Sequence, residues 1–305
     1  MRTKSRRVLI TGIHGFTGRY LSRMLVGLGH QVFGIGMVSS SEAGYFQADL
    51  TDFENLKDVV TRIKPNWVVH LAGISFVGHK NPNDHYRINL ICTRNLLAAL
   101  SENNPLPVKI ILAGSANIYG RVEQEVISED TVPNPPNDYA VSKLAIEYMA
   151  RLWIPRLPLI ITRPFNYTGI GQSTDFVLPK IVDHFKRKAS VIELGNLDIS
   201  RDFNDVRFVA EVYSRLLEKS PAGEVVNICS GRATSLQYIL GCCKSITGHN
   251  IEVRVNPDFV RADDIKTLRG DPRKLKAILG DFDPPPIEQT LQWMLSDGKE
   301  HEQTQ

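Results

Sequence analysis

Short runs of apolar residues alternate along the chain with segments in which apolar residues recur every three to four positions. Such runs are typical of strands buried on both faces of a sheet, and the periodic segments are typical of helices packed on it. The predicted strands span residues 7–11, 31–36, 67–73, 109–113 and 224–229, and predicted helices span residues 53–63 and 84–100. This alternation predicts an α/β fold built on a doubly wound parallel Rossmann sheet.

Three glycines follow the first predicted strand, at positions 12, 15 and 18, and an apolar-periodic helix comes next. Gly12 permits a tight turn, Gly15 lets backbone amides approach a pyrophosphate, and Gly18 lets the helix pack closely on the strand. The spacing is three and three, whereas the commoner dinucleotide fingerprint has two and three. At the first junction of strand and helix, this turn predicts a dinucleotide-binding site.

The second predicted strand ends without an acidic residue, and the chain continues from Gly36 to Ser41. An acid at that point binds the ribose hydroxyls of the adenosine and favours NAD. This run has no carboxylate to repel a 2′-phosphate, its serines could donate to one, and Arg19 could also reach it. We therefore expect NADP(H) to be preferred, with NAD(H) as the alternative.

Tyr139 and Lys143 are four residues apart, just after a proline-rich turn and Asn137. This context predicts the first turn of a helix, with both side chains on one face. A phenol ionises near pH 10 in water, and a neighbouring ammonium favours the phenolate. The spacing alone is common on exposed helices. The Tyr/Lys spacing becomes informative together with Ser115, because Ser115 follows the strand at 109–113, and open parallel sheets bind ligands beyond the ends of their strands.

Charge and cysteine content narrow the class of protein. The chain has 36 basic and 33 acidic residues, and four of the basic ones lie within the first seven positions. The remainder is nearly neutral, which argues against a nucleic-acid or membrane partner. No run approaches the roughly 20 apolar residues of a membrane span. The four cysteines have neither metal-site nor disulfide spacing, so we expect no metal and a cytoplasmic location.

Taken in order, the motifs resemble the extended short-chain dehydrogenase/reductase family over nearly the whole chain. They are Gly12-x-x-Gly15-x-x-Gly18, Asp49-Leu50, Leu71-Ala72-Gly73, Asn89, Ser115, Tyr139-x-x-x-Lys143 and Arg163-Pro164-Phe165-Asn166. The resemblance implies that Tyr139 is the acid/base, that Lys143 lowers its pKa and holds the nicotinamide ribose, and that Ser115 hydrogen-bonds the substrate oxygen. It also implies a homodimer formed through the helices bearing Asn89 and Tyr139. The further cofactor contacts that it implies are Gly12, His14, Gly15, Phe16, Thr17, Gly18, Asp49, Leu50, Leu71, Ala72 and Gly73.

The second half resembles the branch of GDP-mannose 4,6-dehydratases and GDP-4-keto-6-deoxy-mannose reductases. The resemblance lies in residues 163–166, 176–180, 198–203, 261–264 and 270–272. It implies a GDP-sugar substrate whose diphosphate is bound by Asn166, Arg201 and Arg261, with its ribose hydroxyls on Asp264. Forked arginine donors suit a diphosphate, and a carboxylate accepts from two hydroxyls. Ser75 and Lys180 are further candidates for substrate contact.

Asn117 departs from the pattern of this branch. Dehydratases carry a glutamate two residues after the Ser or Thr, where it removes a proton from sugar C5, and an amide cannot act as that base. The sequence therefore favours NAD(P)H-dependent reduction of the 4-keto group of a GDP-4-keto-6-deoxy-hexose, giving a GDP-rhamnose-type product for polysaccharide synthesis. A nucleotide-sugar 4-epimerase, a 4,6-dehydratase with another base and a cofactor-sensing binding protein are the alternatives.

The order of these segments also predicts two domains. Residues 1–165 with 205–229 are expected to form the dinucleotide-binding Rossmann domain. Residues 166–204 with 230–305 are expected to form a smaller mixed α/β domain that binds the nucleotide sugar. The cleft between the two is the expected active site. Within the first domain, His70 ends an apolar strand and is predicted to be a buried histidine with satisfied hydrogen bonds, not a catalyst.

Overall fold

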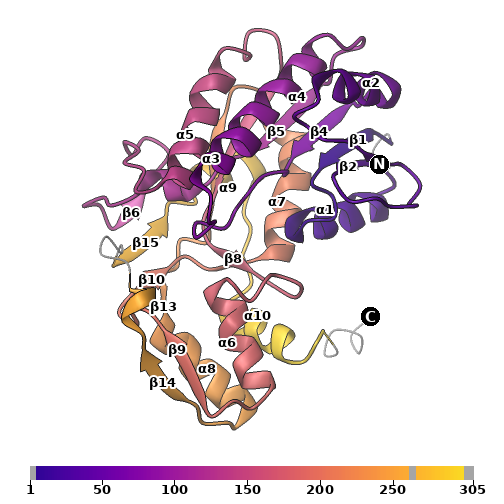
Figure 1. The fold of residues 1–305 in the computed structure, drawn as a ribbon. Helices are drawn as coiled ribbons and strands as arrows, with labels where there is room; N and C mark the ends of the chain where they lie inside the picture. The colour runs from indigo at the N-terminus through magenta and orange to yellow at the C-terminus, as the bar shows by residue number, and fades with distance from the viewer. Residues whose placement is uncertain (1–4, 261–265, 299–305) are drawn as a thin grey trace.

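The computed structural model describes residues 5–260 and 266–298, and its centre is a seven-stranded sheet (Figure 1). The strand order is β12-β7-β5-β4-β1-β2-β3, and every neighbouring pair is parallel. The strands are β1 (Arg7–Thr11), β2 (Gln31–Gly36), β3 (Tyr45–Gln47), β4 (Trp67–His70), β5 (Lys109–Ala113), β7 (Leu159–Pro164) and β12 (Val225–Ile228). The doubly wound parallel sheet predicted from the sequence is confirmed.

The direction of chain winding reverses between β1 and β4. Thr11 at the end of β1 pairs with Ile35 of β2 on one side and with His70 of β4 on the other. Connections that leave the two central strands go to opposite faces of the sheet, which opens a crevice at their carboxyl ends. The glycine turn after β1 and the loop after β4 border this crevice.

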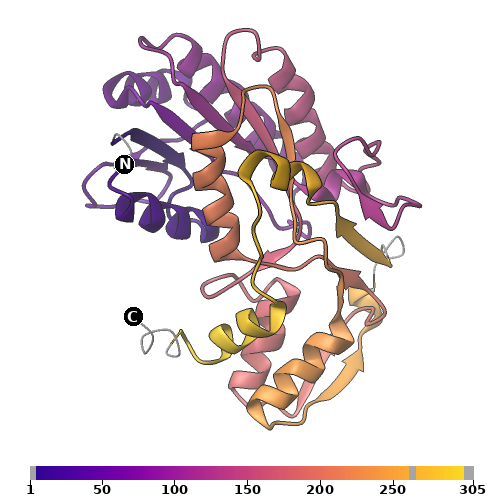
Figure 2. The same cartoon turned by 180° about the vertical axis from the view of Figure 1, so that it is seen from behind.

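Helices cover both faces of the sheet, as Figures 1 and 2 show from opposite sides. Side chains alternate between the faces: Val8 and Ile10 belong to one buried core, and Leu9 belongs to the other. The first core includes residues of α1 (Phe16–Gly27), α7 (Val206–Lys219) and α9 (Arg273–Leu279). The second includes residues of α2 (Phe53–Ile63), α4 (Cys92–Ser101) and α5 (Asp138–Arg151).

The helix expected at residues 84–100 has a different pitch in its first half. A short α3 (Pro82–Asp84) leads into the π-helical segment η1 (His85–Ile91), which continues into α4. Asn89 lies inside η1. Its Oδ1 accepts from the Ile74 amide at 2.8 Å, and its Nδ2 donates to Ser142 Oγ at 3.1 Å. Single π-helical turns occur often at functional sites, and this one ties the loop after β4 to α5.

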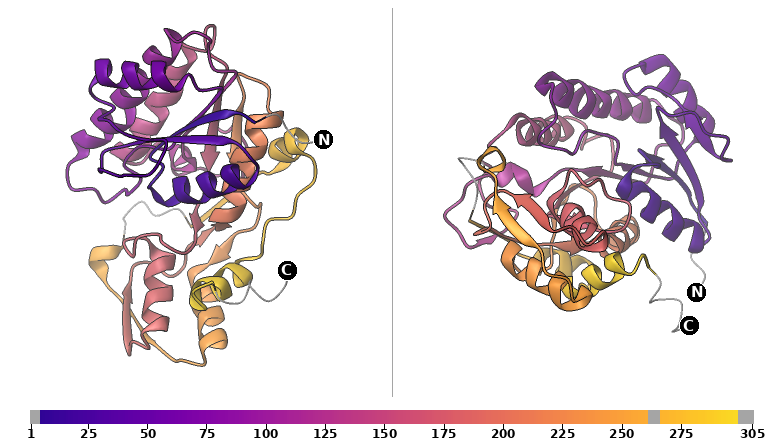
Figure 3. Two further views of the ribbon diagram at one scale, coloured as in Figure 1. Left: turned by 90° about the vertical axis from the view of Figure 1, so that its right-hand side faces the viewer. Right: turned by 60° about the horizontal axis from the view of Figure 1, so that its bottom comes forward.

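A third buried core lies beyond the carboxyl ends of the strands (Figures 1 and 3). It contains residues of α6 (Val177–Lys186), α8 (Leu236–Thr247) and α10 (Ile287–Leu295), with strands β9 (Val191–Leu194) and β14 (Glu252–Val255) paired in parallel. Shorter elements join it to the sheet: β6 (Val126–Ile127), β8 (Tyr167–Thr168), β10 (Ser200–Arg201), β11 (Asn204–Asp205), β13 (Thr234–Ser235), β15 (Thr267–Gly270), η2 (Ala116–Tyr119) and η3 (Pro257–Phe259). The division of the chain into two domains at the expected boundaries stays a prediction.

None of the described helices is both long and apolar enough to cross a membrane. In the same part of the chain, no three His, Cys, Asp or Glu side chains gather in a way that could hold a metal ion.

Candidate active site

A cleft of about 450 Å³ opens at the carboxyl ends of β1, β4 and β5. Its walls come from the glycine turn, from the loops after β4 and β5, from α5 and from residues between 164 and 176. The predicted site residues that line it are Gly12, Gly15, Phe16, Thr17, Gly18, Leu71, Gly73, Ser75, Ser115, Tyr139, Lys143 and Asn166. Strand ends therefore bring together groups that are more than 150 positions apart in the sequence.

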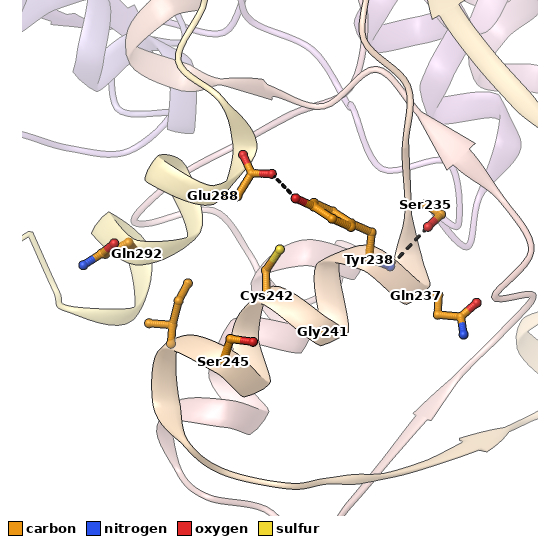
Figure 4. Close-up of a pocket in the computed structure, with 9 residues that line it drawn as sticks. Ser235, Gln237, Tyr238, Gly241, Cys242, Ser245, Glu288 and Gln292 are labelled. Atoms are coloured by element: carbon orange, nitrogen blue, oxygen red, sulfur yellow. Dashed lines mark hydrogen bonds between the residues drawn. The ribbon is translucent and has the colours of Figure 1, made fainter.

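A larger hollow of about 690 Å³ lies on α8 and α10, outside the sheet (Figure 4). Three of its polar side chains are hydrogen-bonded: the Tyr238 hydroxyl donates to Glu288 Oε1 at 2.5 Å, and Ser235 Oγ accepts from the Tyr238 amide. We assign the active site to the smaller cleft, because several buried reactive groups converge there.

The glycine turn leaves no room for side chains. Gly12 has φ +70°, and a Cβ added to it would lie 2.9 Å from the backbone nitrogen of Ala72. A Cβ on Gly18 would lie 2.4 Å from the Gly12 carbonyl oxygen. Gly15 is the N-cap of α1, so no side chain caps the first amides of this helix. Uncapped amides at a helix start form an anion-binding site, which fits the pyrophosphate of a dinucleotide.

Ser115 and Tyr139 meet at the floor of the cleft. Ser115 caps η2, where its hydroxyl accepts from the Asn117 amide at 3.2 Å, and it also hydrogen-bonds the Tyr139 phenol. Asn137 caps α5 by accepting from the Ala140 amide at 2.9 Å, which confirms the predicted helix start. The cap sets Tyr139 in the first turn and Lys143 one turn later on the same face, and both are buried.

The pKa of Tyr139 is shifted upward, whereas the sequence predicted that Lys143 would lower it. Lys143 Nζ donates to the Ala113 carbonyl at 2.8 Å, and burial lowers its pKa to about 8. Burial raises the pKa of Tyr139 to about 12, against a smaller opposing effect of the hydrogen bond with Ser115. Loss of water around a phenolate therefore decides the direction of the pKa shift. Tyr139 holds its proton at neutral pH, which is the state that a general acid needs.

The buried ammonium of Lys143 has a measurable effect on stability. The pKa of Lys143 is about 8 in the folded chain, whereas a lysine in the unfolded chain has the ordinary value of 10.5. Between these values the unfolded chain binds more protons, so stability must rise with pH in this window. We expect the free energy of unfolding of the wild type, relative to that of Lys143→Met, to rise by roughly 3 kcal/mol from pH 8 to 10.5. Urea denaturation across this range measures it, and a flat difference would contradict the buried charge.

Four of the predicted cofactor contacts lie outside the cleft lining: His14, Asp49, Leu50 and Ala72. His14 stacks on Tyr45 with 4.5 Å between ring centroids. Asp49 Oδ1 accepts from the Thr51 amide at 2.8 Å, and Leu50 is buried in the core. Their contacts with a cofactor stay predictions.

The predicted substrate residues have different surroundings. Asn166 and Ser75 line the cleft. Lys180 instead donates to the Glu193 carbonyl at 2.7 Å and lies over the Phe259 ring, away from the cleft lining. Arg201 is partly buried, and its Nη1 donates to the Ser200 carbonyl at 2.9 Å. Arg261 and Asp264 lie outside the described residues.

The structure adds Tyr167 and Gln172 to the cleft lining. The Tyr167 hydroxyl is 2.8 Å from Thr17 Oγ1, so it joins β8 to the start of α1. Gln172 Nε2 donates to the Tyr167 carbonyl, while its buried Oε1 finds no partner among the described residues. Tyr167 directly follows Asn166, so extending that motif by one residue would have found it. Nothing in the local sequence marks Gln172.

His70 is buried and fully hydrogen-bonded, as predicted. Its Nδ1 is 2.7 Å from Thr11 Oγ1 and its Nε2 is 2.9 Å from Thr93 Oγ1. Burial lowers the pKa of His70 to about 3, so the imidazole is neutral at physiological pH. It links the end of β1 to α4.

A doubly wound sheet, a glycine turn at its switch point and a Ser/Tyr/Lys group beside that turn define an enzyme of the extended short-chain dehydrogenase/reductase class. Residues 9–284 match the family described as GDP-mannose 4,6 dehydratase. The chain belongs to this family, whose extended short-chain members are NAD(P)-dependent oxidoreductases and epimerases.

Comparison with individual proteins agrees with this assignment. The chain is 36% identical to GDP-6-deoxy-D-talose 4-dehydrogenase of Aggregatibacter actinomycetemcomitans, over 90% of this chain and 91% of that protein. It is 31% identical to GDP-6-deoxy-D-mannose reductase of Pseudomonas aeruginosa, over 96% and 97% of the two chains. The structure of RMD from Pseudomonas aeruginosa complexed with NADPH superposes with a TM-score of 0.85 at 31% identity, covering 97% of this chain and 98% of that one.

Proposed function

We propose that this enzyme uses NAD(P)H to reduce the 4-keto group of a GDP-4-keto-6-deoxy-hexose, giving a GDP-rhamnose-type product. One observation supports simple reduction above all. Of the described residues that line the cleft, none is an Asp, Glu or His, and the titratable ones are Tyr139, Lys143 and Tyr167. Elimination of water across C5 and C6 needs a base for the C5 proton, and the described lining offers no carboxylate for it.

Asn117 supports the same conclusion. It lines the cleft at the position where dehydratases of the branch carry their glutamate. Its backbone amide donates to Ser115 Oγ, so the residue helps to orient the serine. Its side-chain amide cannot accept a proton at neutral pH.

The proposed chemistry uses three side chains of this enzyme. A bound nicotinamide supplies the hydride. Tyr139 then donates its phenolic proton to the oxygen that develops negative charge at C4, and Ser115 donates a hydrogen bond to the same oxygen. The Lys143 ammonium lies beside the loop after β4, where a Cβ on Gly73 would be 3.8 Å from its Nζ. From this position we propose that it holds the nicotinamide ribose and stabilises the phenolate after proton transfer.

The GDP moiety of the substrate is inferred from relatives and motifs. Both curated relatives are named for oxidation or reduction of a GDP-6-deoxy-hexose. We propose that Asn166, Arg201 and Arg261 bind the diphosphate and that Asp264 binds the ribose hydroxyls. Asn166 lines the cleft. Its carbonyl accepts from the Asn204 amide at 2.8 Å, and this bond holds β11, which follows Arg201 in the chain, beside Asn166.

The preference for NADP(H) expected from the sequence stays a prediction. The Pseudomonas structure complexed with NADPH supports it. The carboxylate of Glu42, 3.2 Å from His14 of the glycine turn, opposes it.

Stoichiometry tests the proposed function. Enzymatically made GDP-4-keto-6-deoxymannose is incubated with the protein and NADH or NADPH, and absorbance at 340 nm is followed. We expect one cofactor oxidised for each sugar reduced, with NMR showing a hydroxyl at C4. Inversion of C4 in a 4-hydroxy GDP-sugar, without net cofactor oxidation and without reduction of the 4-ketone, would identify a 4-epimerase instead. Activity on a UDP-sugar with none on the GDP-sugar would refute the GDP assignment.

We propose a homodimer formed through η1, α4 and α5, because η1 and α5 expose apolar side chains. Ile91 is 44% exposed, Val141 37% and Tyr148 56%. Burial of such a patch against a second copy is favourable. Sedimentation velocity is expected to show a dimer for the wild type and a monomer for Val141→Asp. Val132→Asp, at a valine that is 78% exposed outside these helices, should stay dimeric. A monomeric wild type or a dimeric Val141→Asp would contradict the proposal.

A further inference from the structure

A carboxylate lies against the glycine turn, although none follows β2 directly in the sequence. Glu42 comes from the connection between β2 and β3, and its Oε2 is 3.2 Å from His14 Nε2. His14 lies between Gly12 and Gly15 in the turn. The His14 ring stacks on Tyr45 with an angle of 17° between ring planes. The connection thus folds back on the turn and carries Glu42 with it.

Other contacts hold this connection in place. The Tyr45 hydroxyl donates to the Val38 carbonyl at 2.5 Å, and Gln47 Nε2 donates to the Met37 carbonyl at 3.1 Å. The Glu42 amide donates to Ser40 Oγ at 3.2 Å. Backbone just beyond the end of β2 is therefore tied to β3, so the position of Glu42 is set by several hydrogen bonds besides its own contact with His14.

In doubly wound folds, the place beyond the second strand and beside the glycine turn receives the adenosine ribose. An acid there accepts from the 2′-hydroxyl of NAD, whereas NADP-binding sites place a cation there. Residues 31–56 contain Glu42, Asp49, Asp52 and Glu54 but no Lys or Arg. Arg19, the candidate cation for a 2′-phosphate, donates instead to the carbonyl of Gly171, a residue of the cleft lining, at 3.1 Å.

We infer that Glu42 sets the choice of dinucleotide and selects NAD(H) over NADP(H). Its carboxylate accepts a hydrogen bond from a 2′-hydroxyl and repels a 2′-phosphate, which carries up to two negative charges. This inference rests on the nicotinamide cofactor of the proposed function and is independent of its sugar substrate. It also opposes the expectation drawn from the serines at positions 39–41.

The competing role for Glu42 is a structural pair with His14. The two side chains are 69% and 35% exposed, and pairs this exposed contribute little to stability. Glutamine at position 42 would keep the shape and a hydrogen bond to His14 but lose the charge. A structural role therefore predicts no change in cofactor selectivity for Glu42→Gln, whereas a selective role predicts a large one.

Binding measurements on the full chain separate these roles without any turnover. Calorimetric titrations with NADH and NADPH, and with ADP and 2′,5′-ADP as fragments, give dissociation constants for the wild type and for Glu42→Gln. Glu123→Gln is the matched control, because Glu123 is exposed and precedes β6, on the opposite side of the sheet from β2 (Figure 1). Near-ultraviolet circular dichroism shows whether each variant keeps its fold.

We expect the wild type to bind NADH more tightly than NADPH, and Glu42→Gln to reduce that ratio by about tenfold, the effect of one solvent-exposed charge on a nearby phosphate. The fragments should show the same shift, and Glu123→Gln should show none. A wild type that prefers NADPH, or an unchanged ratio in Glu42→Gln, would overturn the inference. If the selectivity is found but no 4-ketone is reduced, the proposed function fails and the inference stands.

Discussion

Replacing Tyr139 by Phe is expected to lower kcat for 4-keto reduction by about 10²- to 10⁴-fold, the usual contribution of a positioned general acid. The variant keeps the ring and loses only the proton that the C4 oxygen must receive. Because burial raises the pKa of Tyr139 to about 12, the phenol carries its proton at neutral pH. Cofactor binding should change little, since the ring still fills its place beside Ser115.

The matched control is Tyr148→Phe, the same change on the same helix at a tyrosine that is 56% exposed. It should keep near wild-type kcat. Steady-state rates with GDP-4-keto-6-deoxymannose, together with cofactor dissociation constants, separate chemistry from binding. Full activity of Tyr139→Phe would overturn the catalytic assignment, and an equal loss in both variants would point to the fold or the dimer.

Replacing Glu147 by Gln is expected to lower the free energy of unfolding by about 3–5 kcal/mol, because it breaks a buried ion pair from one side. Glu147 and Arg163 are both buried and form two hydrogen bonds, Nε to Oε1 at 2.9 Å and Nη2 to Oε2 at 2.7 Å. Arg163 Nη1 also donates to the Tyr119 hydroxyl at 2.8 Å and to the Glu129 carbonyl at 2.9 Å. Loss of the carboxylate charge leaves this guanidinium without its counter-ion.

The effect of the Glu147→Gln change is measured by urea denaturation against Glu211→Gln. Glu211 pairs with Arg215 on the exposed surface of α7 at 3.2 Å, and breaking such a pair costs about 1 kcal/mol or less. Similar midpoints for the two variants would show that the buried pair is not needed for stability. The pair matters for the site because Arg163 lies at the end of β7, three residues before Asn166.

The sequence predicted the elements that position the site, because their signals are local. The strand at 109–113 and the helix at 53–63 have the predicted bounds, since continuous apolar runs and helical periodicity are read within a few residues. The place of Ser115 beyond the end of a strand was also predicted, because ligands bind beyond the carboxyl ends of the strands in an open parallel sheet.

Other features of the site depend on how deeply a side chain is buried and on the path of a loop. Neither can be read from the local sequence. The pKa of Tyr139 was expected to fall because Lys143 is near it, but the degree of desolvation follows from how deeply α5 packs, and it dominates. Glu42 lies six residues beyond the end of β2, so its contact with His14 appears only when the connection folds back. The π-helical pitch around Asn89 has no signature in the apolar pattern.

Reduction at C4 without removal of the C5 proton leaves a distinct pattern of isotope labels in the product. In one incubation, the enzyme acts on GDP-4-keto-6-deoxymannose in D₂O with unlabelled NAD(P)H. In a separate incubation, it acts on the same sugar in H₂O with cofactor deuterated at nicotinamide C4. Samples without enzyme accompany both. NMR of the product is predicted to show one deuterium at sugar C4, from the cofactor alone, and no enzyme-dependent solvent deuterium at C5. Solvent deuterium at C5 that requires the enzyme, or a sugar C4 without cofactor deuterium, would contradict the account.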